Sequence, residues 1–200
     1  MTDSTTDLTD VRAFLLKYLR EARDALVWKL DGLPEYEVRR PLTPTGTNLL
    51  GLVKHATMVE HGYFGEVFDR PMPPLSWEFD ESVPNIDMWA TAEQSREALV
   101  EEYRRVAERA DALIAELPLE TPGRVPWWAP ERSRVTLHRI VVHVTGDLNR
   151  HAGHADIVRE LTDGAVGLRT PGDNVPAEDA AWWVAYRARL EDVARGFIAD

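Results

Sequence analysis

Four polar side chains in one segment follow the spacing of a helix. His143, Asp147, His151 and His154 are separated by steps of four, four and three, which places them along one face of a helix. Asp147 and His151 could therefore hold one metal ion from adjacent turns. The alternative is an ordinary solvated or hydrogen-bonded helix face. Apolar neighbours indicate a buried helix, in which polar groups need partners: they include Val141, Val144, Leu148, Ala152 and Val158.

Two protein ligands hold a divalent ion weakly, so this segment needs a third ligand from elsewhere. His55 is the best candidate, because it lies on or beside the apolar face of another predicted helix, whereas His61 is turned by about 120° from it. A lone histidine on such a face is by default a core residue satisfied by one hydrogen bond. A histidine/aspartate/histidine set without thiolate suits Zn²⁺ and also accepts Ni²⁺, Mn²⁺ or Fe²⁺. Three protein ligands leave a coordination position open, as in catalytic sites that deprotonate a water or a thiol.

Further residues near this constellation have both functional and ordinary interpretations. His143 and His154 are donors to the ligands, replacement ligands or plain helix residues. Arg150 could attract a substrate carboxylate, although an exposed arginine is the commoner explanation. Trp127 and Trp128 lie in a proline-bounded loop, where they either wall a pocket for a thiol and an apolar substrate or cap the core.

The elements that must position these residues are helices. Hydrophobic spacing predicts helices over 11–33, 49–68, 91–117, 136–161 and 178–198. Asn48 or Thr47 is expected to cap the second helix, and Thr91 with Gln94 resembles a capping box for the third. No run alternates with period two, so no sheet is required. The sequence therefore predicts an all-α four-helix bundle with an additional C-terminal helix, in which Trp182 and Trp183 are helix-packing residues.

Length and composition limit the classes of function. The 200 residues predict one domain over 1–200, with a flexible N-terminus over 1–10 and the extra helix over 177–200. The net charge of -11 argues against a nucleic-acid binder or an anionic membrane surface as partner. The absence of cysteine excludes disulfides, cysteine nucleophiles and thiolate ligands. A polar N-terminus and the lack of a long apolar run predict a cytoplasmic protein without a membrane span.

Two motifs carry a resemblance to a known family. The segments LLGLVKHATMVEHGYF at 49–64 and RHAGHAD at 150–156 resemble those of the DinB-like superfamily, and the resemblance covers about 11–161. The chain is especially similar to an actinobacterial branch that includes mycothiol-dependent S-transferases. The resemblance implies a four-helix bundle whose divalent metal is held by a histidine of the second helix and two residues four apart in the fourth. These correspond here to His55, Asp147 and His151.

One ligand position departs from the pattern of the superfamily. Relatives usually have histidine or glutamate where this chain has Asp147, and an aspartate reaches about one bond less far. His154, where many relatives have glutamine, could contribute instead.

The resemblance implies a metal-dependent thiol S-transferase. Such an enzyme joins a low-molecular-weight thiol, mycothiol or bacillithiol, to an electrophile in detoxification or stress response, so its partners are small molecules. One alternative is a metal-dependent hydrolase that uses a metal-bound water. Another is a non-catalytic metal-binding or dimeric scaffold. A homodimer through a helical face is compatible with all three.

Overall fold

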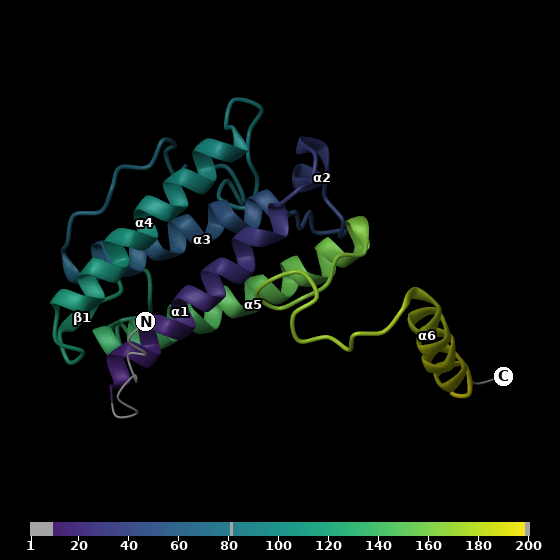
Figure 1. The fold of residues 1–200 in the computed structure, drawn as a ribbon. Coiled ribbons are helices and arrows are strands. Elements are labelled where there is room, and N and C mark those ends of the chain that lie inside the picture. Colours follow the sequence, from purple (N-terminus) through teal and green to yellow (C-terminus); the bar gives the residue numbers. More distant parts are fainter. Residues whose placement is uncertain (1–9, 81, 199–200) are drawn as a thin grey trace, which may run out of the picture.

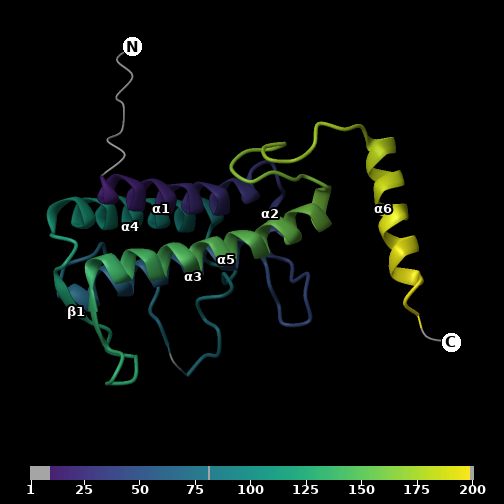
Figure 2. The ribbon, with the colours of Figure 1, turned by 90° about the horizontal axis from the view of Figure 1, so that it is seen from below.

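Four long helices form the body of the molecule. The computed structural model describes residues 10–80 and 82–198, and in it α1 (Val11–Val27), α3 (Leu49–Phe64), α4 (Arg96–Glu116) and α5 (Leu137–Asp163) run side by side (Figure 1). Figure 2 shows two layers, with α1 and α4 in one and α3 and α5 in the other. The apolar faces of all four meet in one hydrophobic core cluster. The predicted all-α bundle is confirmed.

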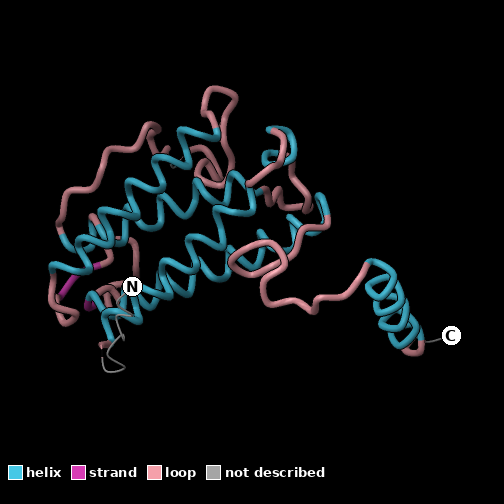
Figure 3. The backbone as a smooth tube through the Cα atoms, in the orientation of Figure 1, coloured by secondary structure: helices cyan, strands magenta, loops and turns pink. Residues whose placement is uncertain are grey.

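Short elements connect the long helices. They are η1 (Trp28–Leu30), α2 (Glu35–Arg39), η2 (Glu66–Phe68), β1 (Pro122–Arg124) and β2 (Arg134–Thr136). The two strands pair antiparallel, with Gly123 opposite Val135, and lie at one end of the bundle (Figure 3). This hairpin corrects the expectation that no sheet is required. Strands of three residues are too short to show a repeating alternation, although Val135 alone is buried between two exposed neighbours.

Three helix starts can be compared with the sequence. Asn48 and Thr136 each accept a backbone N–H in the first turn of α3 and α5, which satisfies a donor without an intrahelical partner. The helix α4 begins later than predicted, because Ser95 is its cap. Thr91 and Gln94 do interact, through a bond from the Thr91 N–H to the Gln94 side chain, but they form a turn before the helix rather than its capping box.

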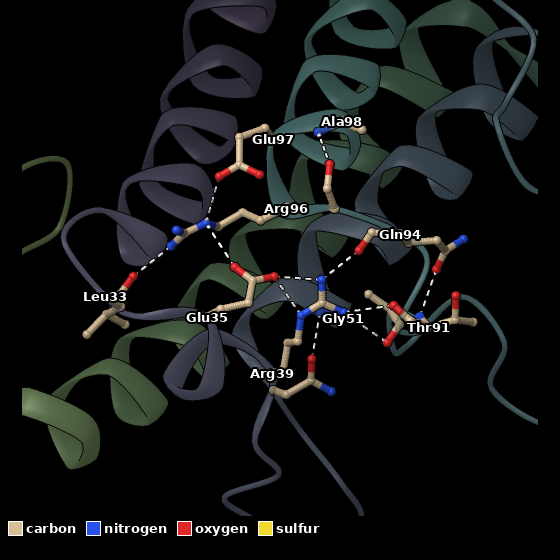
Figure 4. A network of polar contacts seen from close by, with 12 residues as sticks. Leu33, Glu35, Arg39, Gly51, Thr91, Gln94, Arg96, Glu97 and Ala98 are labelled. Atoms are coloured by element: carbon tan, nitrogen blue, oxygen red, sulfur yellow. Dashed lines mark hydrogen bonds and ion pairs between the residues drawn. The ribbon is translucent and has the colours of Figure 1, made fainter.

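An arginine-rich network holds the loop that precedes α4 (Figure 4). The Arg39 guanidinium of α2 donates to the carbonyl of Thr91 at 2.9 Å. Arg96, the first residue of α4, donates to the carbonyl of Leu33 at 2.7 Å. The Glu35 carboxylate lies between the two, 2.6 Å from Arg39 and 3.4 Å from Arg96. The end of the loop over 69–95 is thus fixed to the bundle. This loop also contains Asp87, which contacts His55.

The last helix stands apart from the bundle. A connection over 164–179 leads to α6 (Ala180–Arg195), which is separate from the other helices in both views (Figures 1 and 2). All residues of α6 are described, and none is buried. This corrects the interpretation of Trp182 and Trp183 as residues that pack the helix on the core. Their rings contact each other instead, with centroids 4.9 Å apart.

Two expectations concern the N-terminus and the membrane. The predicted flexible segment over 1–10 lies outside the described residues except for Asp10, whose carboxylate accepts the N–H of Ala13 and caps α1. Within 10–80 and 82–198, no helix has the length and hydrophobicity that a bilayer crossing requires.

Candidate metal centre

The helix α3 is anchored around His55 by a buried lysine. Lys54 is fully buried, and its ammonium donates to the carbonyls of Ile86 at 2.6 Å and Trp89 at 3.0 Å. Burial lowers the pKa of Lys54, and the bonds to the carbonyls satisfy its donors. These contacts hold the loop over 69–95 beside the exposed edge of His55.

This loop supplies an acid that orients His55. The Asp87 carboxylate lies 2.6 Å from His55 Nδ1, and this hydrogen bond lowers the pKa of Asp87. With the Nδ1–H donating to the carboxylate, the Nε2 lone pair of His55 is free to act as a ligand. Asp87 could not be predicted from the sequence, because a carboxylate in an aperiodic loop carries no spacing signal.

The three predicted metal ligands converge. On α5, the buried Val144 and Leu148 turn Asp147 and His151 toward α3. Asp147 Oδ2 lies 3.7 Å from His151 Nε2 and 3.9 Å from His55 Nε2. The imidazole centroids of His55 and His151 are 4.6 Å apart, and one ligand atom from each of the three residues lies within 4.8 Å of the others.

The chemistry of this donor set fits a divalent cation. The distances are too long for hydrogen bonds, whereas donors bound to one tetrahedral ion at about 2.1 Å lie about 3.4 Å apart. Asp147 Oδ2 and His151 Nδ1 are buried and find no hydrogen-bond partner among the described residues. Leaving such groups unpaired is costly, and a cation between the three side chains would satisfy the carboxylate.

The pKa of His151 favours ligation. Burial lowers this pKa, and the nearby charge of His55 lowers it further. A metal binds only the neutral imidazole, since a protonated ring has no lone pair to donate. His151 is therefore in its ligating form at neutral pH.

A cavity of about 630 Å³ opens beside the three ligands. His55 and Asp147 lie on its wall, together with Trp127 and the apolar Met58 and Phe79. A Cβ on Gly62 would lie 3.1 Å from the Trp127 ring, so the glycine lets this indole approach α3 closely. Trp127 thus lies on the wall of this cavity, and its role in substrate binding stays a prediction.

On the same cavity wall, the Tyr63 hydroxyl contacts three side chains. The Tyr63 oxygen accepts from the Trp128 indole at 3.1 Å and the Trp127 indole at 3.4 Å. His143 Nε2 lies 3.0 Å from the same oxygen, and it accepts the single phenolic proton, because both indoles can only donate. His143 thus contacts Tyr63 rather than the three ligands. Trp128 does not line the cavity and packs against the hydrophobic core.

The remaining candidates lie outside the group of ligands. His154 is exposed, with its ring centroid 5.4 Å from that of His151, and its nitrogens are not among the converging atoms. Arg150 is exposed and does not line the cavity. His61 does line it, with its Nε2 3.1 Å from the Pro73 carbonyl, so it is closer to the site than its position on the helix predicts.

Comparisons with known proteins agree with this architecture. Fold and site together define the chain as a DinB-like helical bundle. The model of the Mycothiol-S-transferase family matches residues 14–164, and the chain belongs to this family.

A solved structure supports the fold independently. A conserved protein from Enterococcus faecalis superposes with a TM-score of 0.56 at 15% identity, covering 77% of this chain and 98% of its own. At this identity the similarity shows the fold alone. No curated protein matches the chain. The family match ends at residue 164, before α6.

Proposed function

We propose that this protein is a metal-dependent S-transferase that joins mycothiol to an electrophile in detoxification or stress response in the cytoplasm. The observation that carries the proposal is the convergence of His55, Asp147 and His151, with an unpaired buried carboxylate oxygen, beside a mostly apolar cavity whose wall includes His55 and Asp147. Membership of the Mycothiol-S-transferase family supports the reaction type.

His55, Asp147 and His151 would hold the ion, for which Zn²⁺ is the best choice given two nitrogens, one oxygen and no thiolate. Such an ion, when bound, supplies Lewis acidity that lowers the pKa of a thiol. Asp87 fixes the tautomer of His55 through the bond at 2.6 Å. The protein would thus offer two imidazole nitrogens and one carboxylate oxygen to the ion.

The transfer forms one bond and breaks another. The thiol gives its proton to solvent, and an electron pair of sulfur forms the S–C bond to the electrophile. The leaving group departs as an anion with the electron pair of the bond that breaks, so the proton and this anion are released together with the thioether. Residues of the chain hold the two reactants together in the cavity, which lowers the entropic part of the barrier.

The lining of the cavity favours uncharged reactants. No lysine or arginine occurs among the described residues that line it, whereas Met58, Phe79 and Trp127 provide apolar surface. The nearest acids are Glu66, Asp87 and Asp147, and these would repel a carboxylate. An uncharged thiol and an apolar electrophile therefore suit this wall better than an anionic substrate.

The direct test measures conjugation of an aromatic halide, 1-chloro-2,4-dinitrobenzene, by the zinc-loaded protein with and without mycothiol. We expect turnover that depends on mycothiol and disappears in His151→Ala. The matched control is His138→Ala, an exposed histidine on the same helix, which should keep full activity. Thiol-independent hydrolysis of ester substrates would support the hydrolase instead. If the metal-loaded protein shows neither activity, this result would support the non-catalytic scaffold.

A further inference from the structure

The helix α6 carries an apolar stripe that the fold leaves uncovered. Trp183, Tyr186, Leu190 and Val193 follow steps of three, four and three, and Phe197 continues the series by four in the turn after the helix. This is the spacing of core positions a and d in a coiled coil. Leu190 is 51% exposed, Val193 62% and Phe197 86%. A helix with this pattern normally packs against another helix.

The connection that presents α6 is attached to the bundle. Lys29, itself buried, donates to the Gly167 carbonyl at 2.6 Å, and the Trp28 indole donates to the Leu168 carbonyl at 3.1 Å. The connection is thus held by specific bonds at Gly167 and Leu168, while α6 at its far end extends away from the bundle (Figures 1 and 2). A helix of 16 residues is marginal in water when isolated, so α6 needs a partner surface.

We propose that α6 pairs in parallel with α6 of a second copy of this chain. The stripe is self-complementary under a two-fold axis, because each a and d position meets its own equivalent. Beside the stripe, Trp182 takes position g and Arg187 takes the e position that faces it across a parallel pair. An indole and a guanidinium attract each other. The other flanking pair, Arg189 with Ala194, brings no like charges together.

The surface available is sufficient for a specific contact. Ten stripe side chains, five from each copy, bury on the order of 1,000 Å² if each loses about 100 Å². This is near the lower limit for stable interfaces, so the pairing should be reversible and depend on concentration. The charged Glu191, Asp192 and Arg195 take the outer positions b, c and f and remain in water.

The test uses the full chain and analytical ultracentrifugation over about a hundred-fold range of protein concentration. We expect a monomer–dimer equilibrium that Leu190→Glu shifts to monomer. The matched control is Val184→Glu, since Val184 is 71% exposed and lies on the opposite face of α6. It should keep the dimer. Unchanged thermal unfolding of the bundle in both variants shows that only association is affected. A monomeric wild type, or a dimer that survives Leu190→Glu, overturns the proposal.

Cross-linking tests the parallel geometry. Because the chain has no cysteine, Val193→Cys introduces a single thiol at a d position, which a parallel pair places opposite its equivalent. Mild oxidation should give a covalent dimer of Val193→Cys and not of Ala188→Cys, a variant on the outer face. A dimer that fails to cross-link through residue 193, or that cross-links equally through residue 188, contradicts the α6 pairing and indicates contact with the bundle of the second copy.

Discussion

Two sets of buried polar groups share α3, and their bonding differs. Toward its C-terminal end, Glu60 is fully buried and both of its oxygens accept from Arg23, at 2.8 and 2.5 Å. Arg23 also pairs with Asp111 at 2.6 Å, so this set is closed. One turn away, His55 joins Asp147 and His151 in a set that leaves buried atoms without protein partners. The first group, called the closed set, has a structural role. The second group, called the open set, needs a bound ion to satisfy its buried atoms.

The largest effect should come from opening the closed set. Glu60→Gln removes the fully buried negative partner and leaves Asp111 as the only carboxylate that contacts the Arg23 guanidinium, so we expect a loss of about 2–3 kcal/mol in unfolding free energy. Zinc affinity of the folded protein should not change. Urea unfolding measures the unfolding free energy, and calorimetric titration measures the zinc affinity. Glu108→Gln, at an exposed position of α4, is the control and should be near neutral.

Removing a member of the open set should lower Zn²⁺ affinity and leave the stability of the metal-free protein unchanged or higher, the reverse of the effect of Glu60→Gln. Asp147→Asn deletes the carboxylate that faces both histidines, and Zn²⁺ affinity should fall by more than about 100-fold. Without metal, the variant should unfold at the same temperature as the parent or higher, because an unpaired buried carboxylate oxygen is gone. Calorimetric titration and thermal unfolding in chelator measure the two effects. A marked destabilisation of the metal-free protein would mean that the set is already closed.

The contact with Asp87 should have a smaller effect on the same site. Asp87→Asn weakens the hydrogen bond that orients His55, and we expect a 10- to 100-fold lower Zn²⁺ affinity. Asp80→Asn provides the control, since Asp80 lies in the same loop and its carboxylate contacts Ser82 instead. Equal Zn²⁺ affinities of Asp87→Asn and Asp80→Asn would show that the contact between Asp87 and His55 does not support metal binding.

The smallest effect concerns acid stability at the far end of α5. Hydrogen bonds from Arg159 lower the pKa of Asp163, so the unfolded chain binds a proton more readily than the folded one. The pair therefore stabilises the fold above the ordinary carboxyl range, and this contribution is lost as the pH falls through the lowered pKa. For a partly exposed pair four residues apart it is about 0.5 kcal/mol. Asp163→Asn should make unfolding free energy slightly less dependent on pH below about 4, while leaving zinc affinity unchanged.

Helical periodicity predicted the parts of the fold that depend on long apolar repeats. The cores of α1, α3, α4 and α5, the cap at Asn48 and the start of α5 after Thr136 follow from local sequence. The hairpin of β1 and β2 could not be predicted, because three-residue strands contain less than two periods. The placement of α6 was missed for another reason: an apolar stripe shows that a helix must pack, and it does not show against what.

The candidate metal centre also has one part that could be predicted from the sequence and one part that could not. His55, Asp147 and His151 lie on two helices, where spacing alone indicates which side chains share a face, and the structure brings them together. Asp87 and Tyr63 contribute through contacts across 32 and 80 residues of chain, with His55 and His143, and no local pattern records such contacts. The single domain over 1–200 and the roles of the site residues stay predictions.

The most direct test of the open site is the metal content of the full chain purified without chelator, measured by mass spectrometry beside His151→Ala. We expect about one divalent ion per chain in the parent protein and almost none in the variant. A parent protein without bound ion, whose melting temperature does not change when Zn²⁺ is added, would contradict the claim that His55, Asp147 and His151 form a metal centre.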